Sequence, residues 1–453
     1  MRIKKPQTVG EQMDVEAQIL KHLARDARGS ISFIDEYCSG YKGLFAEVRS
    51  YECFKDLNLG IITTIKRKSL PEISKVVGVN SAQALHHFIA KSPWSVEKLR
   101  DIRLEKTLAA VKGKAIKVII DETGDRKKGN KTDYVARQYL GSVGKVDRGM
   151  VSVNAYGVYQ NITFPLMWKM FKPRGTLKEE DSYQTKIKLA QEIIAELVEL
   201  GFNIELVLAD SLYGESSNFI QTLEKYHLSY IVAIRSNHGV WLLPEQQVRA
   251  NKWHEFTRVF SDKTTQVRFS REIIYGKRRA ITYWEVTTDP ETLPENSTSF
   301  VMTNLQGKIG KTVGNLYGSR TWVEYGFRQV KQELGWTDYR FTKSEQIEKW
   351  WELIYSAYLM VSLSSPAFLT LTEPSSVDTK STEKAPNFSN HQDWNHASGW
   401  KNCLNNLRLI IQPVVLLWMI YPWLKVFPNR DLLLGFHRLI AIVNQFYFGC
   451  NSS

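Results

Sequence analysis

Cysteine is scarce in this sequence, and its spacing argues against two common kinds of site. The 453 residues include only 4 cysteines: Cys38, Cys53, Cys403 and Cys450. They form no C-x-x-C pair and no histidine stands at ligand spacing from them, so neither a zinc site nor a disulfide framework is expected. This usage is typical of a reducing compartment, and we expect a cytoplasmic protein.

Long hydrophobic runs are also few. The first residues, MRIKKPQTVGEQMD, lack the apolar segment of a signal peptide. The most apolar run, 409–424, has only 16 residues and contains Gln412, Pro413 and Pro422, so it is short for a membrane span. We interpret it as a docking or core helix and expect no membrane partner, since no Lys/Arg-rich amphipathic helix stands out either.

Acidic residues are too few to balance the basic ones. Lys and Arg total 60 against 47 for Asp and Glu, which gives a formal net charge of +13. Together with 13 Trp and 20 Tyr, this charge suits a partner that carries many phosphates, although an ordinary basic protein is the alternative. A hydrophobic content of 43% is ample for a buried core.

The N-terminal part of the chain is predicted to be helical. Residues 71–90, PEISKVVGVNSAQALHHFIA, predict two short helices broken at 78–80, with Ser81 as the N-cap of the second. The pattern is helix-turn-helix-like, and a plain packed pair of helices is an equal alternative. A basic triplet that could contact phosphate precedes it: Lys66, Arg67 and Lys68.

Two short apolar runs rich in β-branched residues each end in an aspartate. Residues 115–120, AIKVII, precede Asp121, and residues 204–209, IELVLA, precede Asp210. Such runs predict buried strands. A carboxylate at the end of a central strand is well placed to hold a metal, although Asp near Gly is also common in ordinary turns.

The order of the elements around these runs indicates an α/β fold. The pattern predicts a hairpin over 150–159 and 162–168, helices over 183–200 and 216–226, and a strand over 229–234. Three strands, a helix, a strand, a helix and a strand match the ribonuclease-H-like order, in which helices cover both faces of a mixed sheet. Residues 236–310 then show alternating strand patterns, which we interpret as a β-rich insertion.

Residues 317–331, YGSRTWVEYGFRQVK, form the most informative stretch. Treated as part of one helix over 314–335, it has four polar residues within a narrow stripe, at roughly 0°, 300°, 340° and 320°: Tyr317, Arg320, Glu324 and Lys331. An apolar stripe lies directly beside it: Val323, Phe327, Val330 and Leu334. A surface helix usually places its charges opposite its apolar face, so we expect these groups at the edge of the core, beside a cleft. A solvated helix with i,i+4 pairs is the alternative.

The spacing Tyr317-x2-Arg320-x3-Glu324-x6-Lys331 resembles the Y-R-E-K signature of DDE transposases of the bacterial insertion-sequence four-like group. The longer pattern is similar to the insertion-sequence seven-hundred-and-one family. It includes D-x-T-G-x-x-K-K-G at 121–129, VARQYLGSVGKV at 135–146 and ADSLYG at 209–214. The resemblance covers most of 30–360 and part of the tail near 399–410. It implies a transposase that binds the ends of an insertion sequence and catalyses cut-and-paste DNA cleavage and strand transfer.

The resemblance also implies roles for particular residues. Three acids are the expected catalytic and metal-binding residues: Asp121, Asp210 and Glu324. Related sequences often have Asp-Asp-Thr-Gly at the first site, and this chain has Asp121-Glu122-Thr123, so Glu122 is the alternative first ligand. Five residues are expected to bind DNA, the last two from a basic loop: Tyr317, Arg320, Lys331, Lys127 and Lys128.

The chemistry explains why carboxylates are needed. Cleavage and transfer of a phosphodiester are in-line displacements that two divalent cations about 4 Å apart promote. Oxygen ligands suit Mg²⁺, with Mn²⁺ as the alternative. The expected partners are DNA, as terminal inverted repeats and target, and a second copy of the chain in a homodimer on DNA. The alternatives are a catalytically silent DNA-binding protein of transposase ancestry and a nuclease that does not rejoin ends.

The predicted organisation has five parts. They are a helical DNA-end-binding domain (1–110), a ribonuclease-H-like catalytic core (111–235 and 311–369), a β-rich insertion (236–310), a flexible linker rich in Ser, Thr, Pro and Asn (370–398) and a helical C-terminal tail (399–453).

Overall fold

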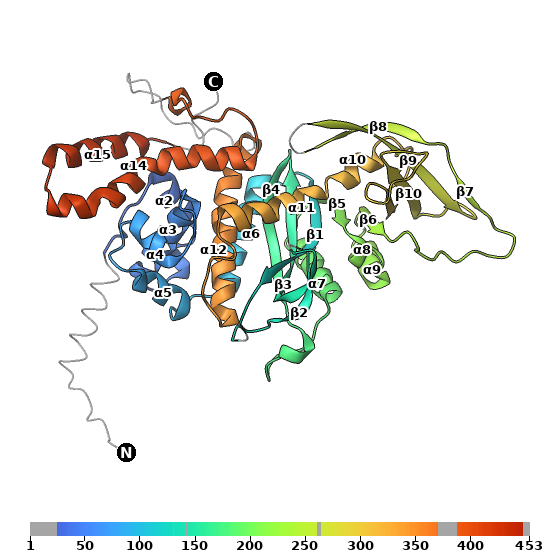
Figure 1. Cartoon of the computed structure of the whole chain (residues 1–453), viewed down its shortest axis with the longest axis horizontal. Coiled ribbons are helices and arrows are strands. Elements are labelled where there is room, and N and C mark those ends of the chain that lie inside the picture. The colour runs from blue at the N-terminus through green and yellow to red at the C-terminus, as the bar shows by residue number, and fades with distance from the viewer. Residues whose placement is uncertain (1–24, 130, 142, 261–263, 370–386, 447–453) are drawn as a thin grey trace, which may run out of the picture.

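The computed structural model describes residues 25–129, 131–141, 143–260, 264–369 and 387–446 (Figure 1). These residues form a mixed α/β structure around an 11-stranded sheet. Residues 1–24 of the predicted helical domain and most of the predicted linker fall outside the described residues.

A group of helices precedes the sheet. Its α-helices are α2 (Ser32–Ser39), α3 (Val48–Ile62), α4 (Leu70–Val76), α5 (Ala82–Ala90) and α6 (Val96–Val111). The chain turns between α4 and α5 at Gly78, whose φ of +72° suits glycine. The Ser81 side chain accepts a hydrogen bond from the Gln83 N–H, which confirms the predicted N-cap.

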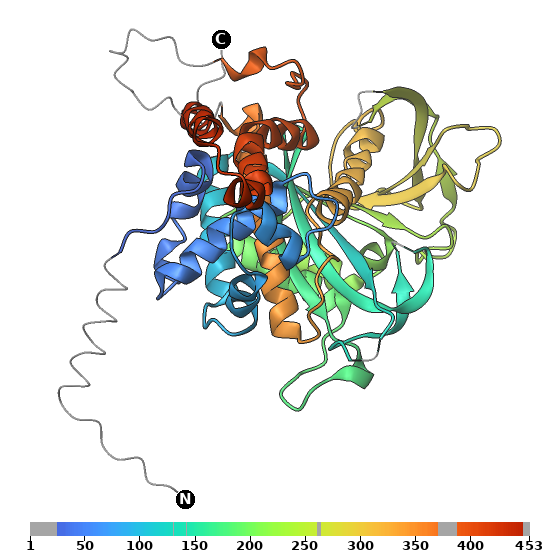
Figure 2. The ribbon, with the colours of Figure 1, turned by 60° about the vertical axis from the view of Figure 1, so that its left-hand side comes forward.

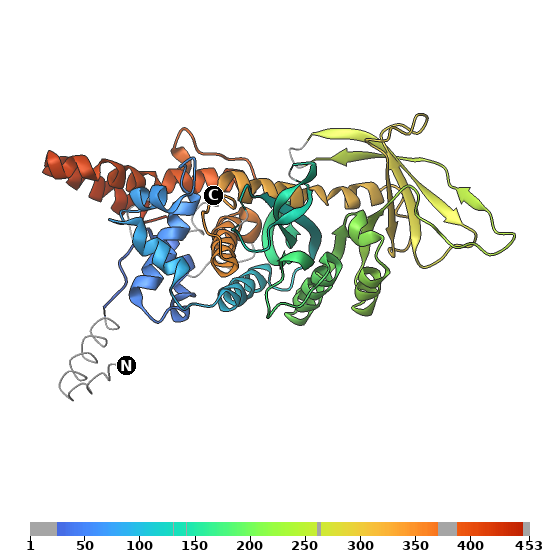
Figure 3. The same ribbon diagram turned by 60° about the horizontal axis from the view of Figure 1, so that its bottom comes forward.

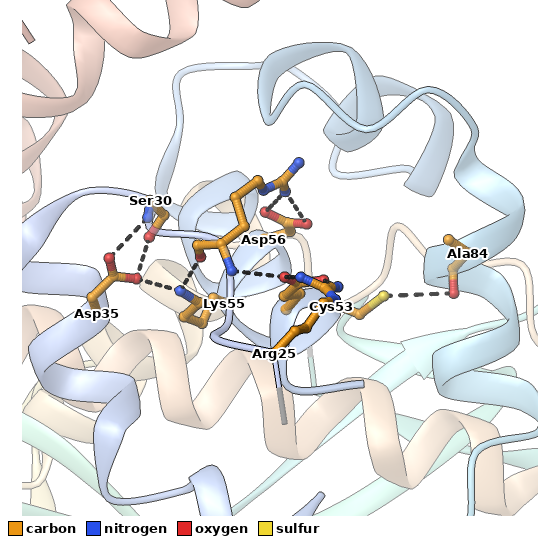
Figure 4. A network of polar contacts seen from close by, with 9 residues as sticks. Arg25, Ser30, Asp35, Cys53, Lys55, Asp56 and Ala84 are labelled. Carbon is orange, nitrogen blue, oxygen red and sulfur yellow. Dashed lines mark hydrogen bonds and ion pairs between the residues drawn. The ribbon is translucent and has the colours of Figure 1, made fainter. Parts of the chain in front are cut away.

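Charged contacts tie the segment before α2 to α3. Arg25 pairs with Glu52 at 2.7 Å and Arg28 with Asp56 at 2.8 Å. The buried Lys55 reaches back from α3 to Asp35 on α2, at 2.7 Å (Figure 4). These contacts hold the first described residues against the helical group.

Six strands form the centre of the sheet: β1 (Ile116–Arg126), β2 (Ala136–Leu140), β3 (Lys145–Tyr159), β4 (Ile162–Phe171), β5 (Ile204–Ala209) and β6 (Tyr230–Ile234). β4, β3 and β1 are antiparallel neighbours, and β1, β5 and β6 are parallel neighbours. This order is consistent with a ribonuclease-H-like core. The strand predicted to end at residue 120 continues to Arg126, because β3 pairs with it as far as Arg126↔Gly149.

The β-rich segment extends the same sheet. It contains β7 (Val248–Ala250), β8 (His254–Val259), β9 (Thr265–Tyr275), β10 (Thr282–Thr287) and β11 (Ser299–Thr303). β11 joins it to the centre by pairing antiparallel with β6. In Figure 3 these strands lie at one end of the molecule, away from the N-terminal helices.

Helices cover both faces of the central sheet, and alternate residues of β1 enter two different cores. Ile119 packs on the face that carries α12 (Ser344–Leu363), whereas Val118 and Ile120 pack on the face that carries α7 (Lys186–Glu199) and α9 (Ser217–Lys225). This follows from the two-residue period of a strand. Consecutive residues of β1 therefore face different environments.

The helix predicted over 314–335 is not one regular α-helix, and this part of the prediction is wrong. It consists of α10 (Val313–Gly318), α11 (Thr321–Arg328) and a π-helical turn, η3 (Gln329–Glu333). The Leu334 N–H bonds to the Gln329 carbonyl five residues back, at 3.3 Å. A π turn changes the angular step between residues, so the ideal wheel does not place Lys331 correctly. The apolar stripe still enters the core, since Val323, Val330 and Leu334 are buried and Phe327 is partly buried against the same core.

The C-terminal described residues form a helical hairpin of α14 (Trp400–Val426) and α15 (Arg430–Val443), seen at the upper left of Figure 2. The 16-residue apolar run belongs to a helix of 27 residues that continues through Pro413 and Pro422. Among the described residues, α14 alone is long and apolar enough to cross a membrane by length and composition, with 28% of its apolar window buried. The expectation that this segment is too short for a membrane span is therefore wrong. The helix packs on α4 and α12, and its buried side chains fall between Trp400 and Leu417.

Candidate active site

The two aspartates stand at the same edge of the parallel part of the sheet. The pairing of β1 with β5 ends at Ile120↔Ala209, and the next residues are Asp121 and Asp210. Asp210 then caps the short helix α8 (Ser211–Gly214), where its carboxylate accepts the Leu212 N–H at 2.9 Å. The open edge beyond the carboxyl ends of parallel strands is where ligands commonly bind in α/β folds.

Gly214 lets α8 lie close to the sheet. A Cβ at this position would stand 1.9 Å from the Ala233 carbonyl oxygen on β6. The neighbour is backbone and cannot move aside cheaply, so only glycine fits. This contact gives a physical reason for the glycine that ends the ADSLYG motif.

We expect Gly214→Ala to destabilise the protein by about 1–3 kcal/mol, as overpacking in a core does. Because α8 follows Asp210 directly, the DNA cleavage that the resemblance implies should fall as well. The measurements are urea unfolding and the cleavage rate. Gly113→Ala is not a suitable control, because the φ of Gly113 is +70° and an alanine there would be strained. Gly175→Ala is a fair one, since no atom lies within 4 Å of its added Cβ. Equal stability of the two variants would contradict the packing argument.

One face of β1 carries a row of polar side chains, and the segment 320–339 contacts each of them. Arg320 Nη1 lies 3.0 Å from Asp121 Oδ2. Lys331 Nζ lies 2.6 Å from Thr123 Oγ1 and 2.7 Å from the Gly124 carbonyl. Farther along the strand, the Tyr339 hydroxyl donates to Asp125 Oδ2 at 2.7 Å. The segment is thus fixed to β1 by polar contacts at every second residue.

Glu122 faces the other side of the sheet. Its Oε1 pairs at 2.8 Å with Nζ of Lys186, the first residue of α7. Alternation along the strand therefore separates it from the side of Asp121 and Arg320. These contacts favour Asp121 over Glu122 as the first acid of the site, although the assignment of ligands stays a prediction.

Arg320 bridges two of the three candidate acids. Besides Asp121, its guanidinium contacts Glu324 Oε1 through Nη2 at 3.0 Å. The Asp121 side chain is 13% exposed and that of Glu324 56%. Burial raises the pKa of Asp121 to about 7, against the effect of Arg320 and with a contribution from the charge of Asp210. The i,i+4 pair that the sequence offered as an alternative is therefore present, but Arg320 also contacts Asp121.

The other expected DNA-binding residues have different environments. Tyr317 is partly buried next to Arg320, and burial raises the pKa of its hydroxyl. Burial lowers the pKa of Lys331 to about 8, partly offset by Asp125. Lys127 is held by Asp125 at 2.8 Å and lies 3.8 Å from the centre of the Tyr339 ring. Lys128 is exposed.

Within the described ranges, no three His, Cys, Asp or Glu side chains are grouped so as to hold a metal ion. The oxygen donors of Asp121, Asp210 and Glu324 fit a hard divalent cation by their chemistry. In this structure Arg320 takes up oxygens of two of these acids. Convergence of all three carboxylates on a cation stays a prediction.

Four residues that make these contacts are not among the site residues expected from the sequence: Thr123, Asp125, Tyr339 and Lys186. The usable signal was the alternation of Asp121, Thr123 and Asp125, which indicates that a strand continues past residue 120 with one polar face. Tyr339 and Lys186 carried no such signal, because their roles depend on the packing of distant segments.

A cavity of about 370 Å³ lies between α4, α5 and residues 338–341. Arg67 and Arg340 line it and are exposed, as is His86. Lys68, expected to reach phosphate, is instead buried, and its ammonium donates to the Thr63 and Ile65 carbonyls. Burial lowers the pKa of Lys68 to about 7. The expectation for Lys68 is therefore wrong.

Comparison with known proteins adds independent information. Residues 44–258 match the family described as DDE superfamily endonuclease, and residues 181–360 match the family described as transposase DDE domain. The chain is 54% identical over 325 residues to the probable transposase for insertion sequence element IS701 of Microchaete diplosiphon. That alignment covers 72% of this chain and 86% of the relative.

Proposed function

We propose that this chain, which belongs to the IS701-like DDE transposases, is a Mg²⁺-dependent endonuclease and DNA strand transferase. It would bind the terminal inverted repeats of its insertion sequence, cut the DNA there and join the ends to a target. The observation that carries the proposal is the placement of Asp121 and Asp210 at the same edge of the paired strands β1 and β5, with Arg320 in contact with both Asp121 and Glu324.

The three acids have distinct supports in this proposal. Asp121 is fixed by β1, which pairs with a strand on each side up to residue 120. Asp210 is fixed as the N-cap of α8, and Glu324 by α11. When bound, a pair of Mg²⁺ ions would activate the attacking oxygen and stabilise the leaving one. The protein's part is to hold carboxylate oxygens for these ions on rigid elements.

The cations of the motif would position the DNA. Arg320 can bind a phosphate with two parallel N–H bonds, and Lys331 would act as a point charge. Tyr317 is next to Arg320, and its hydroxyl would donate a hydrogen bond to a phosphate of the same DNA strand. Lys128 is exposed and would contact DNA phosphates from the protein surface. Lys127 would first have to leave its ion pair with Asp125.

We propose further that the N-terminal helices bind the element end. The cavity between α4, α5 and residues 338–341 supports this, since two exposed arginines, Arg67 and Arg340, line it from opposite parts of the chain. Arginine is suited to phosphate contacts. The proposed domains meet at these boundaries: 110/111, 235/236, 310/311, 369/370 and 398/399. We also propose that the protein acts in the bacterial cytoplasm.

The test of the proposed function uses the purified full chain and DNA that includes the sequences on both sides of its gene. With Mg²⁺ or Mn²⁺, we expect cuts at both element ends and covalent joining to a second DNA molecule, and neither with EDTA. Binding to the end DNA without any cut in either cation would favour the silent DNA-binding alternative. Cuts without joined products would favour the nuclease.

We also propose that the protein acts as a homodimer on DNA, with the hairpin of α14 and α15 as the contact. The distal part of the hairpin exposes large apolar side chains, including Trp423 at 67%, Phe427 at 67% and Met419 at 57%. Exposed apolar patches of this kind mark interaction surfaces. We expect the double variant Met419→Ser/Trp423→Ser to lower the dimer fraction on element-end DNA, measured by mass photometry. Trp241→Ser is the matched control, because Trp241 is 83% exposed and belongs to the segment between β6 and β7, which lies at the end of the molecule away from the hairpin (Figure 1). An unchanged dimer fraction would remove the hairpin from this role.

A further inference from the structure

The two bonds of Arg320 have a consequence for the order in which the site is loaded. One guanidinium nitrogen contacts Asp121 Oδ2 and the other contacts Glu324 Oε1, both at 3.0 Å. The Arg320 side chain is 22% exposed, so much of this contact is shielded from water. The arginine side chain has only N–H donors, so each of its two contacts occupies a lone pair of a carboxylate oxygen. A divalent cation would need the same lone pairs.

We propose that Arg320 is an internal counter-ion that holds the carboxylates of the site while no DNA is bound, and that a DNA phosphate draws it away so that DNA and cation binding strengthen each other. This inference rests on the proposed function. It adds to it a coupling between the two ligands, carried by one side chain with two alternative anionic partners.

The charges support the exchange. Asp121 and Glu324 share the single positive charge of Arg320, and the charge of Asp210 also acts on Asp121. A divalent cation brings two positive charges to the same oxygens, so it displaces the guanidinium and then repels it. A phosphate offers Arg320 a bidentate partner of the same geometry as a carboxylate. When cation and DNA are both bound, the carboxylates pair with the cation and Arg320 pairs with a phosphate. When the cation binds alone, Arg320 loses its carboxylate partners.

The surroundings of Arg320 also favour its movement toward DNA. Arg320 lies at the junction between α10 and α11, where the backbone of Gly318 is held by Arg258 Nη2 at 2.9 Å. The Arg258 side chain is buried there and its charge repels that of Arg320. Glu324, the outer partner, is 56% exposed. The guanidinium can thus leave toward solvent and DNA without unpacking the core.

Thermodynamic linkage makes the idea measurable. If DNA raises the affinity for the cation, the cation must raise the affinity for DNA by the same factor. The factor is expected to be about 5- to 150-fold, the usual range for coupled sites. Removing the side chain that couples the ligands should remove the factor.

The experiment measures Mn²⁺ binding to the full chain by electron paramagnetic resonance, alone and with a saturating duplex of the gene's flanking sequence. We expect the unmodified protein to bind Mn²⁺ more tightly with DNA. Arg320→Ala should bind Mn²⁺ more tightly than the unmodified protein without DNA and gain little from DNA. Arg320→Lys, which keeps one charge, should lie between them. Arg328→Ala is the matched control, since Arg328 is an exposed arginine on the same helix, and it should behave as the unmodified protein.

A further variant locates the bound ion. Adding Glu324→Gln to Arg320→Ala should cancel the gain in Mn²⁺ affinity if the ion uses that carboxylate. If Arg320→Ala binds Mn²⁺ no more tightly than the unmodified protein without DNA, the counter-ion proposal is overturned. The proposed function is judged separately, and it stands if the unmodified protein cleaves DNA. Absence of Mn²⁺ binding in every variant, together with absence of cleavage, would overturn the proposed function itself. Melting temperatures of all variants establish that they are folded.

Discussion

Asp121→Asn and Asp210→Asn should each lower the rate of DNA cleavage by about a thousand-fold or more while DNA binding persists. The size follows from the several kcal/mol of charge stabilisation that bound metal ions supply, since about 1.4 kcal/mol corresponds to a factor of ten. Asparagine keeps the shape of aspartate but loses the negative charge that holds a cation. DNA affinity depends chiefly on Lys and Arg contacts to phosphate, so both variants should still bind element-end DNA in a mobility shift without divalent cation.

The chain offers a matched control for Asp121. Glu122→Gln removes an acid one residue away, but on the opposite face of β1, where it pairs with Lys186. We expect this variant to cleave DNA at a rate close to that of the unmodified protein and to lose only the pair with α7. Full cleavage by Asp121→Asn together with loss of cleavage by Glu122→Gln would show that Glu122 is the first ligand. Full cleavage by Asp210→Asn would contradict the catalytic assignment as a whole.

The sequence predicts the elements of the site better than its contacts. The apolar runs before Asp121 and Asp210 predict two buried strands, and both strands are present with the pairing that sets these residues side by side. Burial of Val323, Val330 and Leu334 also follows from their spacing. Such features are local, because a run of apolar residues must be covered wherever the chain places it.

The features that sequence reasoning missed depend on distant partners. β1 continues to Arg126 because β3 pairs with it, whereas the sequence offers only the short alternation of Asp121, Thr123 and Asp125, beside a glycine that also suits a turn. The π turn at Gln329–Glu333 lets Lys331 reach Thr123 while Glu333 pairs with Lys401 and Arg408 on α14. An ideal helical wheel cannot include these tertiary contacts. The contacts of Arg320 also depend on a distant partner. Glu324 lies at a helical spacing from Arg320, but Asp121 belongs to β1.

The largest loss of stability is expected from a buried ion pair that joins the N-terminal helices to the core. Arg103 on α6 and Glu352 on α12 are both fully buried, and Arg103 Nε contacts Glu352 Oε1 at 2.5 Å. The two remaining arms of Arg103 donate to the Pro165 and Leu166 carbonyls on β4, at 2.8 and 2.9 Å. Glu352 also accepts from Trp168 Nε1 at 3.0 Å. One residue pair thus satisfies polar groups of two helices and a strand.

Removing one partner leaves a buried charge without its counter-charge, which typically costs about 3–5 kcal/mol. We therefore expect Arg103→Met to lower the free energy of unfolding by that amount, measured by urea unfolding followed by circular dichroism. Arg100→Met is the comparison variant, because Arg100 is 17% exposed, contacts Glu352 at the longer distance of 3.4 Å and lies over the Trp168 ring, so its loss should cost less than the loss of Arg103. The double variant Arg103→Met/Glu352→Leu removes both charges and should recover part of the loss, as replacement of buried ion pairs by apolar residues does elsewhere. An Arg103→Met variant no less stable than Arg100→Met would mean that water or a rearranged neighbour takes over the role of Arg103, and that the N-terminal helices are held to the sheet by apolar packing alone.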